Sequence, residues 1–395
     1  MDLGRFPCVM RHNAAGRCYL ATRNVSAGET VLRCAPIAAA LHDRDVPKRC
    51  SRCFAPTDGV PCTCHAIFCS TCAKSSDAKR EHRGECMAVK LALSDRKTRN
   101  ALGLKSKSST GTATTFLRLA VRLLSVRARH SRSKPVLLLG DPDGDGEWIP
   151  SADEDVIHDS WEDVEELSPE TDEALEALLA RLQKGRVEEL EGGVNAVRLL
   201  SGSRRASWDD VFRLLCRISM NAMTLAPEAQ VRRALTSSKS RWKDFGIGLY
   251  PSGAMLNHSC FPSCLWFVRS GTLIVETLRV VRRGEELTIA YLPVSGTVTQ
   301  RRRRLLHAFG FHCVCSHCEA ESNLQKKVQR RPASSEGSCR TPSKRSRAQR
   351  ERPPPRMEHG RPWIERAPSQ VPLSPRRSLK RPASSRGLAE RPQKR

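Results

Sequence analysis

The sequence predicts an α+β fold in which strand-rich segments lie toward both ends of the folded part and helices lie between them. Residues 265–292 contain short apolar runs, two of them separated by the turn Ser270–Gly271, and this pattern is typical of strands. Apolar residues recur at helical spacing over 115–129 and 208–221, which predicts two helices. Residues 322–395 hold 21 Lys and Arg and 11 Pro with almost no apolar periodicity, so they predict a disordered basic tail.

An acidic segment and a third helix are expected in the middle of the chain. Residues 141–176 carry 16 Asp and Glu and no Lys or Arg, which indicates a solvated acidic loop. Ser168 is a capping residue type and Pro169 suits the first helical position, so the pattern predicts that a helix opens there. Its apolar side chains are Leu175, Leu178, Leu179 and Leu182.

The net charge is concentrated in the tail. The chain has 67 Lys and Arg against 42 Asp and Glu, a formal charge of +25, and residues 322–395 account for +16 of it. Such a tail suits nuclear import or contact with nucleic acid phosphates, although a solvated tail without a partner is the alternative. No run approaches the roughly 18 to 20 apolar residues that span a bilayer, so we expect no membrane partner.

Seven of the 17 cysteines fall within residues 50–86, a density that predicts metal binding in a reducing compartment, the nucleus or the cytoplasm. Thiolates one or two residues apart can bind one ion together, and alternating pairs give two interleaved zinc sites. The first consists of Cys50, Cys53, Cys69 and Cys72, and the second of Cys62, Cys64, His82 and Cys86. His65 is an alternative to Cys64, because it has the more usual spacing from Cys62.

A third group of thiols lies near the start of the basic tail. Cys313, Cys315 and Cys318 offer three ligands within six residues and need a fourth from elsewhere. His317 is the local candidate. The sequence therefore predicts three zinc ions.

Several motifs, in this order, resemble those of the SET and MYND domain lysine methyltransferases. They are Gly16-Arg17-Cys18-Tyr19 followed by Ala27-Gly28-Glu29, the cysteine cluster, Gly248-Leu249-Tyr250-Pro251-Ser252, Asn257-His258-Ser259-Cys260-Phe261-Pro262, Gly284-Glu285-Glu286-Leu287-Thr288-Ile289-Ala290-Tyr291, and Phe311-His312-Cys313-Val314-Cys315. The resemblance implies a SET-domain β-fold that a MYND-type zinc finger and a helical insert interrupt, followed by a post-SET zinc site. It divides the chain into the N-terminal part of the SET domain (1–49), the finger (50–86), the insert with its acidic loop (87–244), the C-terminal part of the SET domain (245–295), the post-SET region (296–321) and the tail (322–395).

The resemblance also implies a function, transfer of a methyl group from S-adenosylmethionine to a protein lysine, of histones or of other proteins. By motif position, the cofactor-binding residues are Gly16, Arg17, Asn221, Asn257, His258, Tyr291 and Phe311. Tyr291 is the expected catalytic residue, with its hydroxyl beside the transferring methyl, and Cys260 is the expected fourth ligand of the post-SET zinc. The finger is expected to bind proline-rich peptides.

Two departures from the family pattern leave an alternative function open. Cys18 replaces the second glycine of a G-x-G motif, and Phe309 stands where relatives often have tyrosine. These changes favour a catalytically weak or inactive scaffold that binds partners or chromatin through its zinc finger and tail. Intact Asn257, His258 and Tyr291 favour the enzyme.

Overall fold

The computed structural model describes residues 6–13, 16–92, 94, 112–130, 156–201, 206–236 and 243–329. All of them belong to one compact unit, Met1–Arg340. The start of the predicted acidic loop, over 141–155, and the predicted tail beyond residue 329 lie outside the described residues. Within the described part of the chain, no helix has the length and apolar character needed to cross a bilayer.

One sheet joins the two ends of the folded part, in the order β1-β2-β13-β10. The hairpin of β1 (Cys8–Asn13) and β2 (Gly16–Ala21) is antiparallel, and β13 (Glu286–Ile289) pairs with β2 through Leu20 and Tyr19. The short strand β10 (Asn257–His258) lies parallel to β13. This sheet therefore places the N-terminal glycine motif beside the asparagine-histidine motif, more than 200 residues later in the chain.

A second sheet has the order β11-β12-β3-β7. It contains β11 (Cys264–Arg269), β12 (Thr272–Thr277), β3 (Thr30–Ala35) and the short strand β7 (Ile157–His158). Ser270 and Gly271 connect β11 to β12 with φ angles of 50° and 90°, as a type I′ hairpin turn requires. The strand and turn predictions for this region are confirmed.

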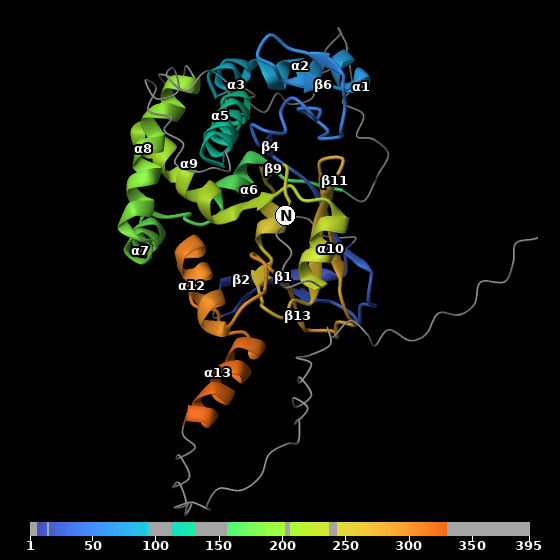
Figure 1. Ribbon diagram of the computed structural model, residues 1–395, viewed down its shortest axis with the longest axis vertical. Helices are drawn as coiled ribbons and strands as arrows, with labels where there is room; N and C mark the ends of the chain where they lie inside the picture. The colour runs from blue at the N-terminus through green and yellow to red at the C-terminus, as the bar shows by residue number, and fades with distance from the viewer. Residues whose placement is uncertain are drawn as a thin grey trace, which may run out of the picture. The chain divides into compact units, whose positions relative to one another are not determined.

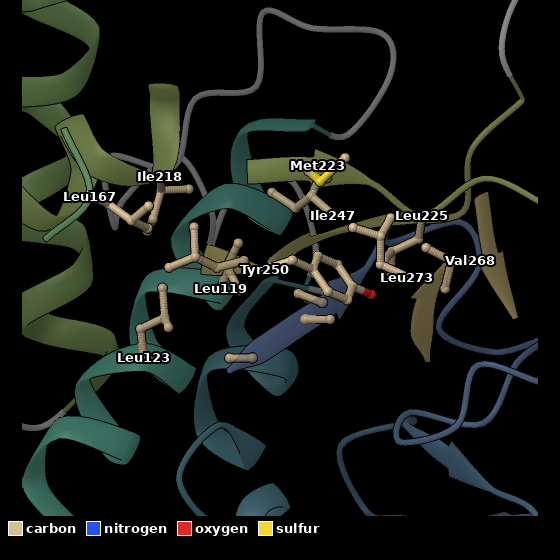
Figure 2. Close-up of a cluster of buried hydrophobic side chains, with 14 of the residues drawn as sticks. Leu119, Leu123, Leu167, Ile218, Met223, Leu225, Ile247, Tyr250, Val268 and Leu273 are labelled. Carbon is tan, nitrogen blue, oxygen red and sulfur yellow. The ribbon is translucent and has the colours of Figure 1, made fainter. Parts of the chain in front are cut away.

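A third sheet, β4-β9-β8, lies against the helical insert. Every residue of β4 (Ala38–Leu41) and β9 (Gly246–Leu249) is buried, and β8 (Ala222–Thr224) completes the sheet. Continuous burial is typical of strands covered on both faces. Helix α5 (Thr112–His130) packs against β4 and β9, and Figure 2 shows Leu119 and Leu123 of α5 pointing into the apolar cluster that also contains Ile247.

The insert is helical, and α5, α8 (Lys184–Ser201) and α9 (Trp208–Asn221) pack on one another (Figure 1). The predicted helices over 115–129 and 208–221 are confirmed as α5 and α9. The predicted start at Ser168 is wrong, because α7 (Asp172–Arg181) begins after Thr171, whose hydroxyl accepts from the backbone N–H of Ala174. The remaining short helices of this region are α6 (Trp161–Glu165) and α10 (Glu228–Thr236).

The cysteine-rich segment forms a small substructure of its own. It contains the hairpin of β5 (Val60–Pro61) and β6 (Ile67–Phe68), then α1 (Ser70–Lys74), α2 (Ser76–Arg83) and α3 (Cys86–Ala92). A bridge between Cys50 and Ile67 closes it on itself, and α3 contacts α5 and α8.

The last described segments follow the C-terminal strands. Helix α11 (Pro251–Ala254) precedes β10, α12 (Val298–Phe309) follows β13, and α13 (Ser316–Gln329) ends the described chain. Residues 322–329 are therefore helical, whereas the sequence predicts that the disordered tail begins at residue 322. Apolar spacing in α13 is weak, with Leu324 exposed, which is why the sequence did not indicate a helix there.

Candidate functional site

The finger brings its eight predicted donors into two groups of four. Cys50, Cys53, Cys69 and Cys72 form one group and Cys62, Cys64, His82 and Cys86 the other, and within each group the ligand atoms lie within 4.8 Å of one another. Cys53 Sγ lies 3.8 Å from Cys69 Sγ, and Cys62 Sγ lies 3.7 Å from Cys86 Sγ. Four sulfurs about 2.3 Å from one zinc ion form a tetrahedron with edges of about 3.8 Å. The donor sets and their spacing therefore fit two structural zinc ions.

His65 is not part of either group. It is exposed at a positive φ of 70°, whereas Cys64 is buried with its Sγ 3.3 Å from His82 Nε2. The turn at His65 directs the buried thiol of Cys64 toward the other donors. Of the two alternatives, the structure favours Cys64.

An ion pair between the buried Glu85 and the partly buried Arg122 lies next to the second finger site. His82 Nδ1 lies 3.3 Å from Glu85 Oε1, and Arg122 Nε of α5 donates to Glu85 Oε2 at 2.5 Å. Arg122 also donates to the carbonyls of Ala39 and Ser51. Arg122 holds the pKa of the buried Glu85 carboxyl at about 2, despite the opposing effect of burial. An ionised Glu85 fixes the histidine ring so that Nε2 faces the metal position.

The third group consists of Cys260, Cys313, Cys315 and Cys318, again within 4.8 Å. Cys260 Sγ lies 3.9 Å from Cys313 Sγ and 3.5 Å from Cys318 Sγ. His317, the local alternative, lies outside the group and stacks on Phe261 with a centroid distance of 6.5 Å. The buried Arg301 of α12 donates to Cys318 Sγ at 3.4 Å and to Glu321 at 2.7 Å, which offsets negative charge on the thiolates.

The predicted cofactor residues of β2 and β10 meet at the first sheet. Asn257 Nδ2 donates to the carbonyl of Arg17 at 3.0 Å and to Glu286 Oε1 at 2.9 Å. Because Nδ2 of Asn257 donates to both acceptors, its amide oxygen points away from Arg17 and Glu286. Gly16 has a φ of +105° and nothing within 4 Å of the position that a Cβ would take, so its backbone is open to a close approach.

Four aromatic rings gather where β13 leads toward α12. Tyr291 lies with its ring centroid 5.3 Å from His258, 5.0 Å from Phe309 and 6.3 Å from Phe311. The Tyr291 hydroxyl donates to the carbonyl of Leu256 at 2.8 Å. Burial, followed by the nearby Glu286, raises the pKa of the Tyr291 phenol.

His258 connects this aromatic group to the third cysteine cluster. The backbone N–H of Tyr291 donates to His258 Nδ1 at 3.0 Å, and His258 Nε2 lies 3.3 Å from Cys260 Sγ. An accepting Nδ1 places the proton of the neutral ring on Nε2, facing the thiolate. Burial lowers the pKa of His258 to about 4, consistent with a neutral ring.

Arg17 and Asn221 both bind the segment 165–168, which begins at the last residue of α6. Arg17 donates to the carbonyl of Glu166 at 2.5 Å, and Asn221 Nδ2 donates to the carbonyl of Ser168 at 2.7 Å. Arg217, one turn before Asn221, donates to the carbonyls of Glu165 and Leu167. Asn221 thus approaches the other predicted cofactor residues through this segment, and no contact between its side chain and Asn257 is among the described ones.

The structure adds polar groups that the sequence analysis did not identify: Glu286, Glu85, Arg122, Arg301 and the Leu256 carbonyl. Glu286 lies within the recognised Gly284–Tyr291 motif, which was the signal available for it. Arg122 lies within a predicted amphipathic helix, where a charged residue is usually solvent-exposed, so its buried contact could not be predicted. The two unusual positions are also defined: the Cys18 side chain is 1% exposed, and Phe309 packs on Tyr291.

Comparison with known proteins finds a matching family model and several relatives. The SET domain family model matches residues 16–292. The histone-lysine N-methyltransferase SMYD3 of Homo sapiens is 27% identical over 165 residues, which cover 42% of this chain and 34% of that protein. The same enzyme of Mus musculus is 31% identical over 112 residues, or 28% of this chain and 23% of that protein. A SET and MYND domain-containing protein of Dictyostelium discoideum is 23% identical over 325 residues, 78% of this chain and 80% of that protein.

Among solved structures, one of Rubisco LSMT bound to AdoMet aligns with 79% of this chain and 53% of that one, at 12% identity and a TM-score of 0.30. The chain spans about a quarter to a third of the length of the mouse and human relatives. Because the family model matches more than half of the chain, the chain belongs to the SET domain family, among its SET and MYND domain relatives.

Proposed function

We propose that this chain is a protein-lysine N-methyltransferase that uses S-adenosylmethionine. The observation that carries the proposal is the convergence of three distant segments: Asn257 bonds to Arg17 and Glu286, and Tyr291 lies next to His258. In a member of the SET domain family, this is the combination of an oriented amide, an open glycine backbone and a buried phenol that cofactor binding and methyl transfer require.

Seven residues would hold the cofactor: Gly16, Arg17, Asn221, Asn257, His258, Tyr291 and Phe311. The fit is supported by the open space above Gly16 and by the amide oxygen of Asn257, which is left to accept from an ammonium group. S-adenosylmethionine, when bound, supplies an electrophilic methyl group on a sulfonium sulfur. The chain's own task is to position a lysine and exclude water from it.

Tyr291 would position that lysine. Its hydroxyl proton is committed to the Leu256 carbonyl, so the phenol oxygen offers lone pairs to an incoming amine. Its raised pKa keeps the phenol protonated, so Tyr291 orients the amine and does not act as a base. The lysine ammonium, with an ordinary pKa of about 10.4, must therefore lose its proton to solvent before transfer.

The finer organisation of the chain is part of the same proposal. The cysteine-rich substructure over 50–86 is a MYND-type zinc finger that interrupts the SET domain, and the Cys260 cluster is a post-SET zinc site. Their donor sets and sulfur spacing support this assignment. The finger would bind proline-rich peptides, and the basic tail would contact nucleic acid.

The substrate class and location are proposed by analogy. Two of the relatives are named histone-lysine N-methyltransferases, which supports lysines of histones as substrates, with other proteins as the alternative. The protein would act in the nucleus, the cytoplasm or both.

A methyl-transfer assay with tritiated S-adenosylmethionine and mixed histones tests the activity, with Tyr291→Phe as the matched control. We expect the wild-type protein to label histones and the variant to lose about 10²-fold or more of the rate, because one positioned hydroxyl is removed. Zinc content should be unchanged.

The pH dependence follows from the same residue. Because the pKa of Tyr291 lies above its ordinary value of 10.0, the phenol stays protonated below that pH. The rate should therefore rise steadily from pH 7 to 9.5 with the fraction of neutral lysine, without an additional step from the tyrosine. Equal background labelling by both proteins at every pH would instead favour the inactive scaffold.

A further inference from the structure

Glu286 is a carboxylate in the proposed cofactor site, and its partners among the described residues are neutral amides. Its Oε1 accepts from Asn257 Nδ2 at 2.9 Å, and its Oε2 accepts from Asn13 Nδ2 at 3.2 Å. No ion pair reaches it from the residues that the structure describes. The preceding residue is different: Glu285 pairs with Arg279 at 2.5 Å. Glu286 is thus held in place without being neutralised.

Its position brings this charge to the residues of the proposed site. Glu286 begins β13 and pairs with Leu20 of β2, the strand that carries Gly16 and Arg17. Its field contributes, after burial, to the raised pKa of the Cys18 thiol and of the Tyr291 phenol. The carboxylate therefore acts electrostatically on both sides of the site, at the glycine motif and at the tyrosine.

We infer that Glu286 makes this site selective for a cationic cofactor over its neutral product. The inference rests on the proposed function and names a specificity-determining residue of that same site. During transfer the bond from sulfur to the methyl carbon breaks as the bond from nitrogen to that carbon forms. The positive charge leaves sulfur for the amine nitrogen, which later releases a proton to solvent.

S-adenosylmethionine and its product S-adenosylhomocysteine therefore differ by one positive charge, at the sulfur atom. A fixed carboxylate attracts the sulfonium of S-adenosylmethionine and gains little from the thioether of S-adenosylhomocysteine. Selectivity of this kind favours exchange of spent for fresh cofactor. The Glu286 carboxylate would then have two roles: it orients the Asn257 amide and it favours the cationic cofactor.

Calorimetric titration of the full chain with each of the two ligands tests the inference. Glu286→Gln keeps an acceptor oxygen for Asn257 and removes the charge. We expect the ratio of the two dissociation constants to fall by about fivefold, through weaker binding of S-adenosylmethionine, with the affinity for S-adenosylhomocysteine changed by less than about twofold. Glu285→Gln, in which the neighbouring, partly buried carboxylate is removed, should leave the ratio unchanged.

Glu286→Asp separates charge from positioning, since it keeps the charge and shortens the reach to Asn257. It should weaken both ligands while keeping the wild-type ratio, and it serves as the second test if Glu286→Gln loses zinc or stability. An unchanged ratio in Glu286→Gln, or equal weakening of both ligands, would overturn the inference and leave the proposed function intact. If the wild-type protein bound neither ligand, both would be overturned.

Discussion

Arg122 is the clearest case in which one partly buried side chain connects parts of the chain that are distant in sequence. It extends from α5 to Glu85 behind the second finger site and to carbonyls of β4 and of the finger. Glu85 is 1% exposed, and Arg122 supplies the cationic partner of its charge, beside the His82 ring. An uncompensated buried carboxylate is among the most destabilising defects that a substitution creates.

We therefore expect Arg122→Met to reduce the free energy of unfolding by about 3 to 5 kcal/mol. The matched control is Arg127→Met on the same helix, whose partner Asp210 is 40% exposed, and it should cost less than about 1 kcal/mol. Urea unfolding at saturating zinc measures both. Equal losses in the two variants would contradict the interpretation of Arg122.

The candidate site could be predicted in part, because some of its contacts join residues close in sequence and others join residues far apart. The zinc donors of the finger were assigned from spacing alone, because ligands one or two residues apart in sequence must also lie close together in space. The positions of Asn257 and Tyr291 came from the resemblance to a family. Their partners did not: Glu286 and the Leu256 carbonyl reach them from other turns and strands, and no local pattern encodes such contacts.

Among the helices, the predictions succeeded where one apolar face and the end signals are visible in the sequence. Helix α9 has the predicted bounds 208–221, because its capping box and its buried apolar side chains agree. Helix α8 was not predicted, because Gly185, Gly192 and Gly193 lower its intrinsic propensity. Its buried residues, among them Val194 and Val197, pack on α5 and α9, so tertiary contacts override the propensity.

Strand β9 and helix α8 give opposite expectations for the same substitution. A Cβ on Gly246 in β9 would lie 2.3 Å from the backbone oxygen of Ala40, on a strand paired along both edges. A Cβ on the exposed Gly192 in α8 would meet nothing within 4 Å. Gly246→Ala should lower the free energy of unfolding by about 2 kcal/mol or more. Gly192→Ala should raise it by about 0.5 to 1 kcal/mol.

Thermal or urea unfolding of the two glycine variants checks these signs. The comparison isolates the neighbours of each glycine, since both substitutions add one methyl group. A loss of stability in Gly192→Ala would show that the described packing of α8 is wrong, and a neutral Gly246→Ala would show the same for β9.

For the whole molecule, the structure changes the meaning of the basic composition. Four consecutive arginines, Arg301–Arg304, lie in α12 and would give an exposed helix a basic surface. However, Arg301, Arg302 and Arg304 each donate to groups within the fold, the carbonyls of Gly296, Cys313 and Ser295. The hydrogen bonds of these three arginines therefore tie α12 to the segments before and after it.

Three separate metal groups within one chain lead to a final expectation about the whole protein. Metal analysis should find about three zinc ions per chain, since the described donors form three sets of four. Cys53→Ser and Cys315→Ser should each remove one ion, and Cys216→Ala, which changes a buried core thiol, should remove none.

The two ligand variants should differ in cofactor binding. Cys315 belongs to the cluster whose Cys260 contacts His258, and His258 in turn accepts from the Tyr291 backbone. Cys315→Ser should therefore weaken S-adenosylmethionine binding by about tenfold or more, as for other losses of metal-site support. Cys53→Ser changes a site that no described contact links to Tyr291, and its affinity should stay within about twofold of wild type. Calorimetry on the two variants distinguishes a post-SET cluster that organises the cofactor site from one that only stabilises the fold, because in the second case both variants would bind the cofactor equally well.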